Sequence, residues 1–206
     1  MERRQIKWRE QERVLVGKIE NHIRRLSAMN ANYSNGHVTR TARLSGAMAV
    51  KQGMSELDCM IVAEFGLKHD LGKNDPAARS WIERNRGVRV SEQERLKFRV
   101  YHSVMGTNFV RLLDRTGAVT TPEQDEEVCL YHHDPYYELR GGFKQHIAIV
   151  QIADGFDAMM STDDEHSFAR FTEAETIREL FSRSCTGELD PATVETLVFC
   201  RGLSLA

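Results

Sequence analysis

Apolar residues recur at spacings of three and four along most of the chain, which is the period of helices that pack by one face. Runs that alternate between apolar and polar residues, as half-buried strands do, are few, and there are only four prolines. The pattern therefore predicts an all-α protein built as a helical bundle. No internal repeat or low-complexity segment is visible.

The first predicted helix covers residues 5–29 and is amphipathic. One side of it carries Val14, Leu15, Ile19, Ile23, Leu26 and Met29. Such a face either packs on the core of the domain or pairs with a second subunit in a homodimer, and the sequence leaves both open. We expect residues 1–30 to be an N-terminal helix packed on a domain of residues 31–206.

Capping residues indicate where the other helices begin. Ser55 is a predicted N-cap, and Ser91 with Glu94 three residues later is typical of a capping box. Thr121 precedes a proline suited to a first helical turn. The predicted helices are 37–51, 55–69, a short helix within 74–90, one from 91 past 102, 121–133, 145–160, 173–184 and 191–201. The segment 134–144 is predicted to be a loop beside the substrate.

Seven residues able to bind metal are distributed along these helices. They are His37, His69, Asp70, His102, His132, His133 and Asp154. Successive single ligands or adjacent pairs are separated by about 20 to 32 residues, which is the length of one helix and its connection. Neighbouring helices of a bundle could therefore project all seven side chains inward. A carboxylate between imidazoles can bridge two ions roughly 3.5–4 Å apart. We expect a two-metal hydrolytic centre with Asp70 as the bridge, holding Fe or Mn, with Zn and Ni as alternatives.

The segment His69–Lys73 follows an apolar run and is expected to end a helix. Gly72 would let the chain turn away, and Lys73 would direct its ammonium group towards a bound phosphate. The alternative is an ordinary helix end, at which His69 and Lys73 only balance the helix dipole.

The remaining acids and histidines also have expected roles. Asp154 lies in an apolar helix, where an ionised carboxylate is costly without a cation, and Asp157 one turn later is expected to support the site by hydrogen bonding. Adjacent residues on a regular helix point about 100° apart, so either one of His132 and His133 binds metal while the other turns towards substrate, or the pair lies at a helix end. The other histidines, His22, His146 and His166, are expected on the surface, with His166 nearest to the substrate.

These motifs, taken in order, resemble the HD superfamily of metal-dependent phosphohydrolases, and within it the HD-GYP branch of cyclic di-GMP phosphodiesterases. The matching segments are 37–40 (HVTR), 69–73 (HDLGK), 101–106 (YHSVMG), 131–134 (YHHD), 152–158 (IADGFDA) and 187–191 (GELDP). The resemblance implies an HD-domain bundle that hydrolyses a cyclic dinucleotide with a hydroxide bridging two metals. Asp70 and Lys73 are expected to be catalytic, and Lys73, Arg40 and His166 are expected to bind substrate.

Two departures from the branch bear on the substrate, and a third bears on the number of metals. The Asp-Gly-x-Gly-Tyr-Pro loop is replaced by the sequence DPYYELRGGF at 134–143, and an expected basic stretch is acidic at Asp163, Asp164 and Glu165. Tyr33 stands where some relatives have a glutamate for a third metal. Two other functions therefore stay open: an HD phosphohydrolase for another nucleotide or small phosphoester, and a non-catalytic, metal-stabilised sensor module.

Composition fits a compact domain of this kind. The 206 residues are 41% hydrophobic and 28% charged, with a net charge of −2, which argues against duplex nucleic acid as a partner. A local basic stretch, residues 84–99, is interpreted as a solvated helix face. The four cysteines are widely spaced and are expected to be reduced thiols of a cytoplasmic protein, since no secretory segment or membrane span is visible.

Overall fold

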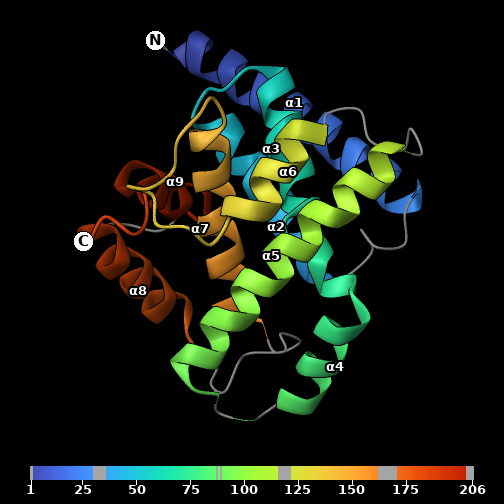
Figure 1. The fold of residues 1–206 in the computed structure, drawn as a ribbon. Helices are drawn as coiled ribbons and strands as arrows, with labels where there is room; N and C mark the ends of the chain where they lie inside the picture. The colour runs from blue at the N-terminus through green and yellow to red at the C-terminus, as the bar shows by residue number, and fades with distance from the viewer. Residues whose placement is uncertain are drawn as a thin grey trace.

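The computed structural model describes residues 2–29, 36–86, 88, 90–115, 122–161 and 171–202. Within these ranges the chain forms nine α-helices, one short 3-10 helix and no strand (Figure 1), so the all-α prediction is confirmed. The elements are α1 (Glu2–Met29), α2 (Gly36–Lys51), α3 (Glu56–Lys68), η2 (Leu71–Asn74), α4 (Pro76–Asn85), α5 (Glu92–Arg115), α6 (Pro122–Tyr131), α7 (Lys144–Met160), α8 (Glu173–Cys185) and α9 (Pro191–Cys200).

Ser55 and Ser91 begin their helices as expected, and Thr121 lies outside the described residues. The Ser55 hydroxyl accepts a hydrogen bond from the Asp58 amide at 3.1 Å, which fixes the start of α3. Ser91 and Glu94 exchange the two hydrogen bonds of a capping box before α5, at 3.2 and 3.3 Å. Such local signals located the ends of the later helices within about two residues, whereas the first helix begins at Glu2, three residues before its predicted start.

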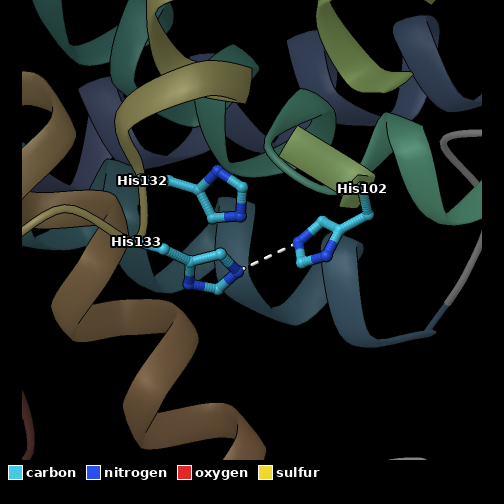
Figure 2. Close-up of side chains that lie close together, drawn as sticks. All are labelled: His102, His132 and His133. Atoms are coloured by element: carbon cyan, nitrogen blue, oxygen red, sulfur yellow. Dashed lines mark hydrogen bonds between the residues drawn. The ribbon is translucent and has the colours of Figure 1, made fainter. Parts of the chain in front are cut away.

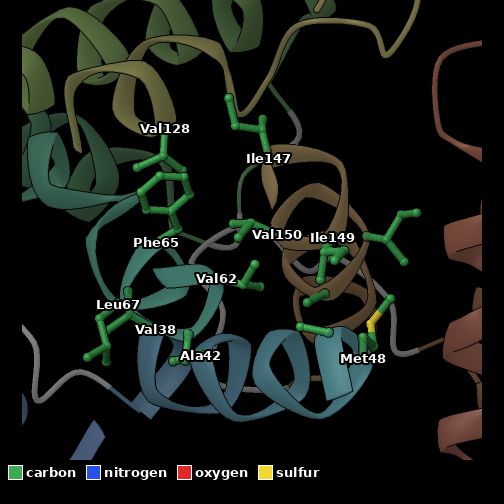
Figure 3. Close-up of a cluster of buried hydrophobic side chains, with 14 of the residues drawn as sticks. Val38, Ala42, Met48, Val62, Phe65, Leu67, Val128, Ile147, Ile149 and Val150 are labelled. Atoms are coloured by element: carbon green, nitrogen blue, oxygen red, sulfur yellow. The ribbon is translucent and has the colours of Figure 1, made fainter. Parts of the chain in front are cut away.

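Helices α2, α3 and α7 pack on one another and form the centre of the bundle. Ala42 of α2, Val62 and Phe65 of α3 and Ile149 of α7 are fully buried there (Figure 3). Each fully buried side chain of the larger kinds stabilises the fold by roughly 1.5–3 kcal/mol. Gly66 allows α3 to approach α2 closely, because a Cβ at this position would lie 2.6 Å from the Ala42 Cα. The centre of the bundle is therefore a rigid support for the ends of α2 and α3.

The N-terminal helix α1 belongs to the same core. Ile19 and Ile23 are buried in it, with Leu15 and Leu26 packed at its edge. The prediction that Val14 shares this face is wrong, since its side chain is 55% exposed. Adjacent residues point about 100° apart, and the core takes the direction of Leu15. The homodimer through α1 stays a prediction.

Two histidines that we expected on the surface pack against acidic side chains of α3. His146 is buried, with its Nε2 3.2 Å from an Asp58 carboxylate oxygen, so that prediction is wrong. His22 is partly buried, with its Nε2 3.4 Å from Glu64. Both rings turn inward because a carboxylate lies within reach, a long-range contact that periodicity does not reveal.

All four cysteines are free thiols, with Cys59 and Cys129 buried. Among the described residues, no helix combines the length and the apolar character that crossing a bilayer requires.

Candidate metal centre

The seven candidate ligands come from five separate parts of the bundle and cluster in its interior. His37 lies in the first turn of α2, His69 and Asp70 follow α3, His102 lies in the middle of α5, His132 and His133 follow α6, and Asp154 lies in α7. Their ligand atoms form two groups, each with all its atoms within 4.8 Å of one another. The first group is His37, His69, Asp70 and Asp154, and the second is His102, His132 and His133.

Asp70 joins the two groups. Its Oδ2 lies 3.5 Å from the Nε2 of His37 and 3.3 Å from that of His69. Its Oδ1 lies 3.4 Å from the Nε2 of His102 and 3.8 Å from that of His132. Each oxygen of one carboxylate therefore faces one group, which is the arrangement that a carboxylate bridging two cations requires.

Hydrogen bonds fix the tautomers of the histidines. The Nδ1 of His69 lies 2.9 Å from the Gly66 carbonyl, and that of His102 lies 2.9 Å from the Phe98 carbonyl. The Nδ1 of His132 likewise lies 3.0 Å from the carbonyl of Val128. A carbonyl only accepts, so each Nδ1 carries the proton and each Nε2 turns a lone pair towards the cavity. This is the orientation of metal-binding histidines.

Several of these inward-facing atoms lack any hydrogen-bond partner although they are buried. They are the Nε2 atoms of His69 and His132 and the Oδ1 of Asp70. Buried polar atoms in native proteins are almost always satisfied, so three such atoms at one point need an explanation. A cation accounts for all three, because each atom presents a lone pair. The two groups are thus consistent with a metal site.

The electrostatics of the two groups differ. Burial alone would lower the pKa of His37, but Asp154, Asp157 and Asp70 raise it to about 12. In the other group burial dominates and lowers the pKa of His102 to about 3 and that of His132 to about 4. The first group therefore strongly favours positive charge, and the second holds neutral imidazoles, which is the metal-binding form.

The paired histidines share one direction because α6 ends at Tyr131, just before them. Their ring centroids lie 4.0 Å apart, and the Nε2 of His133 lies 2.9 Å from the Nε2 of His102 (Figure 2). The helix end that we predicted as one solution for the pair is confirmed.

Asp157 holds His37, a member of the first group, through its Nδ1 atom. Its Oδ2 lies 2.7 Å from the Nδ1 of His37, and its Oδ1 accepts a hydrogen bond of 2.7 Å from the Arg40 guanidinium. Arg40 also donates to the Ser161 hydroxyl at 2.9 Å. The hydrogen-bonding role expected for Asp157 is confirmed.

Gly72 is needed for a reason other than the one we expected. Its φ is not positive, so it does not serve a left-handed turn. A Cβ there would lie 2.6 Å from the Gly106 amide nitrogen and closer still to the His102 carbonyl oxygen. Gly72 therefore lets η2, which follows Asp70, touch the backbone of α5 beside His102.

The cavity over the two groups has a volume of about 240 Å³. Lys73 lines it, with its Nζ 2.7 Å from Asp70 Oδ2. The sequence did not predict that Trp81, Phe98, Arg95 and Arg99 also line it. The two arginines belong to the basic stretch that we interpreted as a solvated helix face. Arg99 and Arg95 precede His102 by three and seven residues, and this shared side of the helix was the only available signal. His166 and the acidic residues Asp163, Asp164 and Glu165 lie outside the described residues.

Comparison with solved structures identifies the architecture. The HD domain of the L. monocytogenes phosphodiesterase PgpH, in complex with cyclic-di-AMP, aligns with a TM-score of 0.52 over 87% of this chain and 93% of its own. The fold is HD-domain-like. A second structure of the same PgpH domain gives a TM-score of 0.51, over 87% of this chain and 94% of its own. Sequence identities to this HD domain are only 17% and 15%. No protein-family model matches the chain, and no curated protein gives a significant match.

Proposed function

We propose that this chain is a metal-dependent phosphodiesterase of HD-GYP type that hydrolyses a cyclic dinucleotide. The observation that carries the proposal is the Asp70 carboxylate, whose two oxygens face two separate groups of ligand atoms. The HD-domain-like fold supports it, and the cyclic-di-AMP bound to the PgpH domain supports a cyclic dinucleotide as the ligand.

The metal ligands and Lys73 would have different roles in the proposed reaction. Two divalent ions, Fe or Mn with Zn and Ni as alternatives, would supply Lewis-acid charge and a water of lowered pKa. The seven candidate ligands would hold these ions. Lys73 would place its positive charge beside the non-bridging oxygens of the scissile phosphate, where charge develops during attack.

Two further substrate-binding roles stay predictions. Arg40 is expected to bind substrate, but its guanidinium already contacts Asp157 and Ser161, which favours positioning His37. His166 is expected to approach the substrate and lies outside the described residues. The cytoplasmic location likewise stays a prediction.

A second function is favoured by the size of the cavity. Sites for drug-sized ligands enclose about 300–1,000 Å³, whereas this cavity has about 240 Å³. A mononucleotide or another small phosphoester would fit such a volume more readily than a whole cyclic dinucleotide.

A substrate comparison tests the proposal. Protein loaded with Mn²⁺ or Fe²⁺ is incubated with cyclic di-GMP, cyclic-di-AMP, nucleoside monophosphates and p-nitrophenyl phosphate, and the products are separated by chromatography. We expect cleavage of a cyclic dinucleotide that is abolished in Asp70→Ala and kept in the control Asp114→Ala, an exposed carboxylate on α5. Cleavage of monoesters alone would favour the second function. Bound metal without any hydrolysis would indicate the sensor module.

A further inference from the structure

Lys68 is a buried lysine for which the proposed reaction has no role. It is 3% exposed and is not among the described residues that line the cavity. Lysine is almost never buried unless its charge is paired. The Nζ of Lys68 contacts the carboxylates of Glu64 on α3 and Asp125 on α6, the latter at 2.5 Å. Apolar residues of similar volume often stabilise a protein as well as a buried ion pair does, so stability alone does not explain this lysine.

The ion pair between Lys68 and Asp125 joins two helices whose ends carry candidate ligands. Lys68 is the last residue of α3, and the pair His69-Asp70 follows it directly. Asp125 lies in α6, which ends just before the pair His132-His133. Both partners of the ion pair are buried, so salt screens their attraction much less than it screens an exposed pair. The ion pair therefore ties one pair of ligands to the other.

A second contact joins Lys68 to α6 through the backbone. The Cys129 thiol donates a hydrogen bond of 3.3 Å to the Lys68 carbonyl. Burial raises the pKa of this thiol, which keeps it protonated. The Cys129 carbonyl in turn lies 3.0 Å from the Nδ1 of His132. Helix α6 is thus held to the end of α3 at Asp125 and again one turn later, beside His132.

The two ligand groups depend differently on these contacts. The first group comes from α2, the end of α3 and α7, and it includes the carboxylate of Asp154. The second group consists of three histidines from α5 and the end of α6. The Oδ1 of Asp70, which faces His102 and His132, comes from the end of α3. A shift of this end against α6 would therefore draw Asp70 away from the second group, with less effect on the first.

We propose that Lys68 is a positioning residue of the metal centre, which through Asp125 and Cys129 sets the distance from Asp70 to the second group. The inference rests on the two-metal centre of the proposed function and assigns a determinant of the affinity for its second ion. A charge-assisted hydrogen bond fixes the geometry of its partners. Apolar contact is non-directional, so it would hold α3 and α6 together without fixing their register.

Removal of both charges tests the proposal without leaving an unpaired partner of the ion pair. In Lys68→Met/Asp125→Leu, apolar side chains of similar volume replace the pair, and Glu64 keeps His22 beside it. Stepwise Mn²⁺ binding is measured by competition with a chelator. Electron paramagnetic resonance at low temperature detects the spin-coupled pair of ions, and thermal unfolding without metal reports the stability of the fold.

The matched control is Lys18→Met/Glu56→Leu, which removes an exposed ion pair of 2.7 Å between α1 and α3. The control should bind both ions as the native protein does. In Lys68→Met/Asp125→Leu the first ion should keep its affinity, whereas the second should bind about 10-fold more weakly. The spin-coupled signal should fall accordingly, and Tm without metal should not fall.

An unchanged affinity for the second ion, or an equal loss for both ions together with a lower Tm, would overturn the proposal. If Lys68→Met/Asp125→Leu does not fold, Asp125→Asn decides by the same measurement, because it keeps an acceptor for the Lys68 ammonium group but removes the negative charge. Selective weakening of the second ion without hydrolysis of any phosphoester would retain the positioning role and reject the proposed activity. Hydrolysis with an unaffected second ion would do the reverse.

Discussion

Replacement of Gly72 by alanine tests how the centre is built. The added Cβ would meet backbone atoms of Gly106 and His102, which cannot move aside as a flexible side chain can. Ordinary contact begins at 3.4 Å, so η2 and α5 would have to separate by roughly 1 Å or more. That separation would move Asp70, which precedes η2, away from His102 of α5.

The magnitude follows from two opposing effects. Gly72 has no positive φ, so an alanine that fitted would stabilise the protein by about 0.4–1 kcal/mol through the unfolded state. Overpacking of a rigid contact costs about 1–3 kcal/mol and occasionally more. Since the obstacles here are two backbones, the cost is at the upper end, and we expect a net loss of about 2 kcal/mol. In a protein of this size that lowers Tm by about 4–8 °C.

The matched control is Gly17→Ala. Gly17 lies in α1, and nothing is within 4 Å of the position where its Cβ would be. Its replacement should stabilise the helix by about 0.5–1 kcal/mol. Thermal unfolding is followed by circular dichroism, and bound metal is measured on the same samples. If Gly72→Ala is as stable as the native protein and binds the same amount of metal, the close contact between η2 and α5 is not needed and our reasoning is wrong.

Three further predictions concern side chains around the centre. Asp157→Ala should weaken metal binding by about 10- to 100-fold in competition with a chelator, because His37 loses its orienting partner, and unchanged affinity would remove Asp157 from the site. Lys73→Ala should keep both ions yet lower kcat/KM by about 10²- to 10³-fold; an unaltered rate would leave Lys73 a structural role only. Burial alone would raise the pKa of Glu64, but His22 and Lys68 lower it to about 2. The ionised Glu64 carboxylate therefore stabilises the folded protein by about 2–3 kcal/mol above pH 4.5, and this contribution is lost as the pH falls towards 2. Glu64→Gln should therefore lower Tm at pH 7 and flatten its fall between pH 5 and 3, whereas a parallel curve would show that the buried ion pairs add no net stability.

Features that span only a few residues of the sequence predict much of the fold. The period of apolar residues and the caps at Ser55 and Ser91 act within one or two helical turns, so they predict helix ends without any knowledge of packing. The candidate ligands were also predictable, because their spacing of one helix each matches the way in which a bundle directs side chains inward.

What the sequence did not reveal depends on contacts between distant segments. Gly72 is explained only by the backbone of α5, and the burial of His146 only by its contacts with Asp58, Phe65 and Phe143. The place of Trp81 and Phe98 beside the cavity was missed because their stacking joins two helices. In the sequence, an isolated aromatic residue cannot be told from any other core residue. Such features follow from tertiary packing, which no local pattern encodes.

The most direct test of the two-metal proposal is the number of ions bound per chain. Protein purified without chelator and loaded with Mn²⁺ or Fe²⁺ is analysed by inductively coupled plasma mass spectrometry, together with Asp70→Ala and the control Asp114→Ala. Because each oxygen of Asp70 faces one ligand group, we predict two ions per chain in the native protein and the control. We predict that the folded Asp70→Ala variant loses both. Two ions retained in Asp70→Ala, or a single ion in the native protein, would contradict the bridged centre.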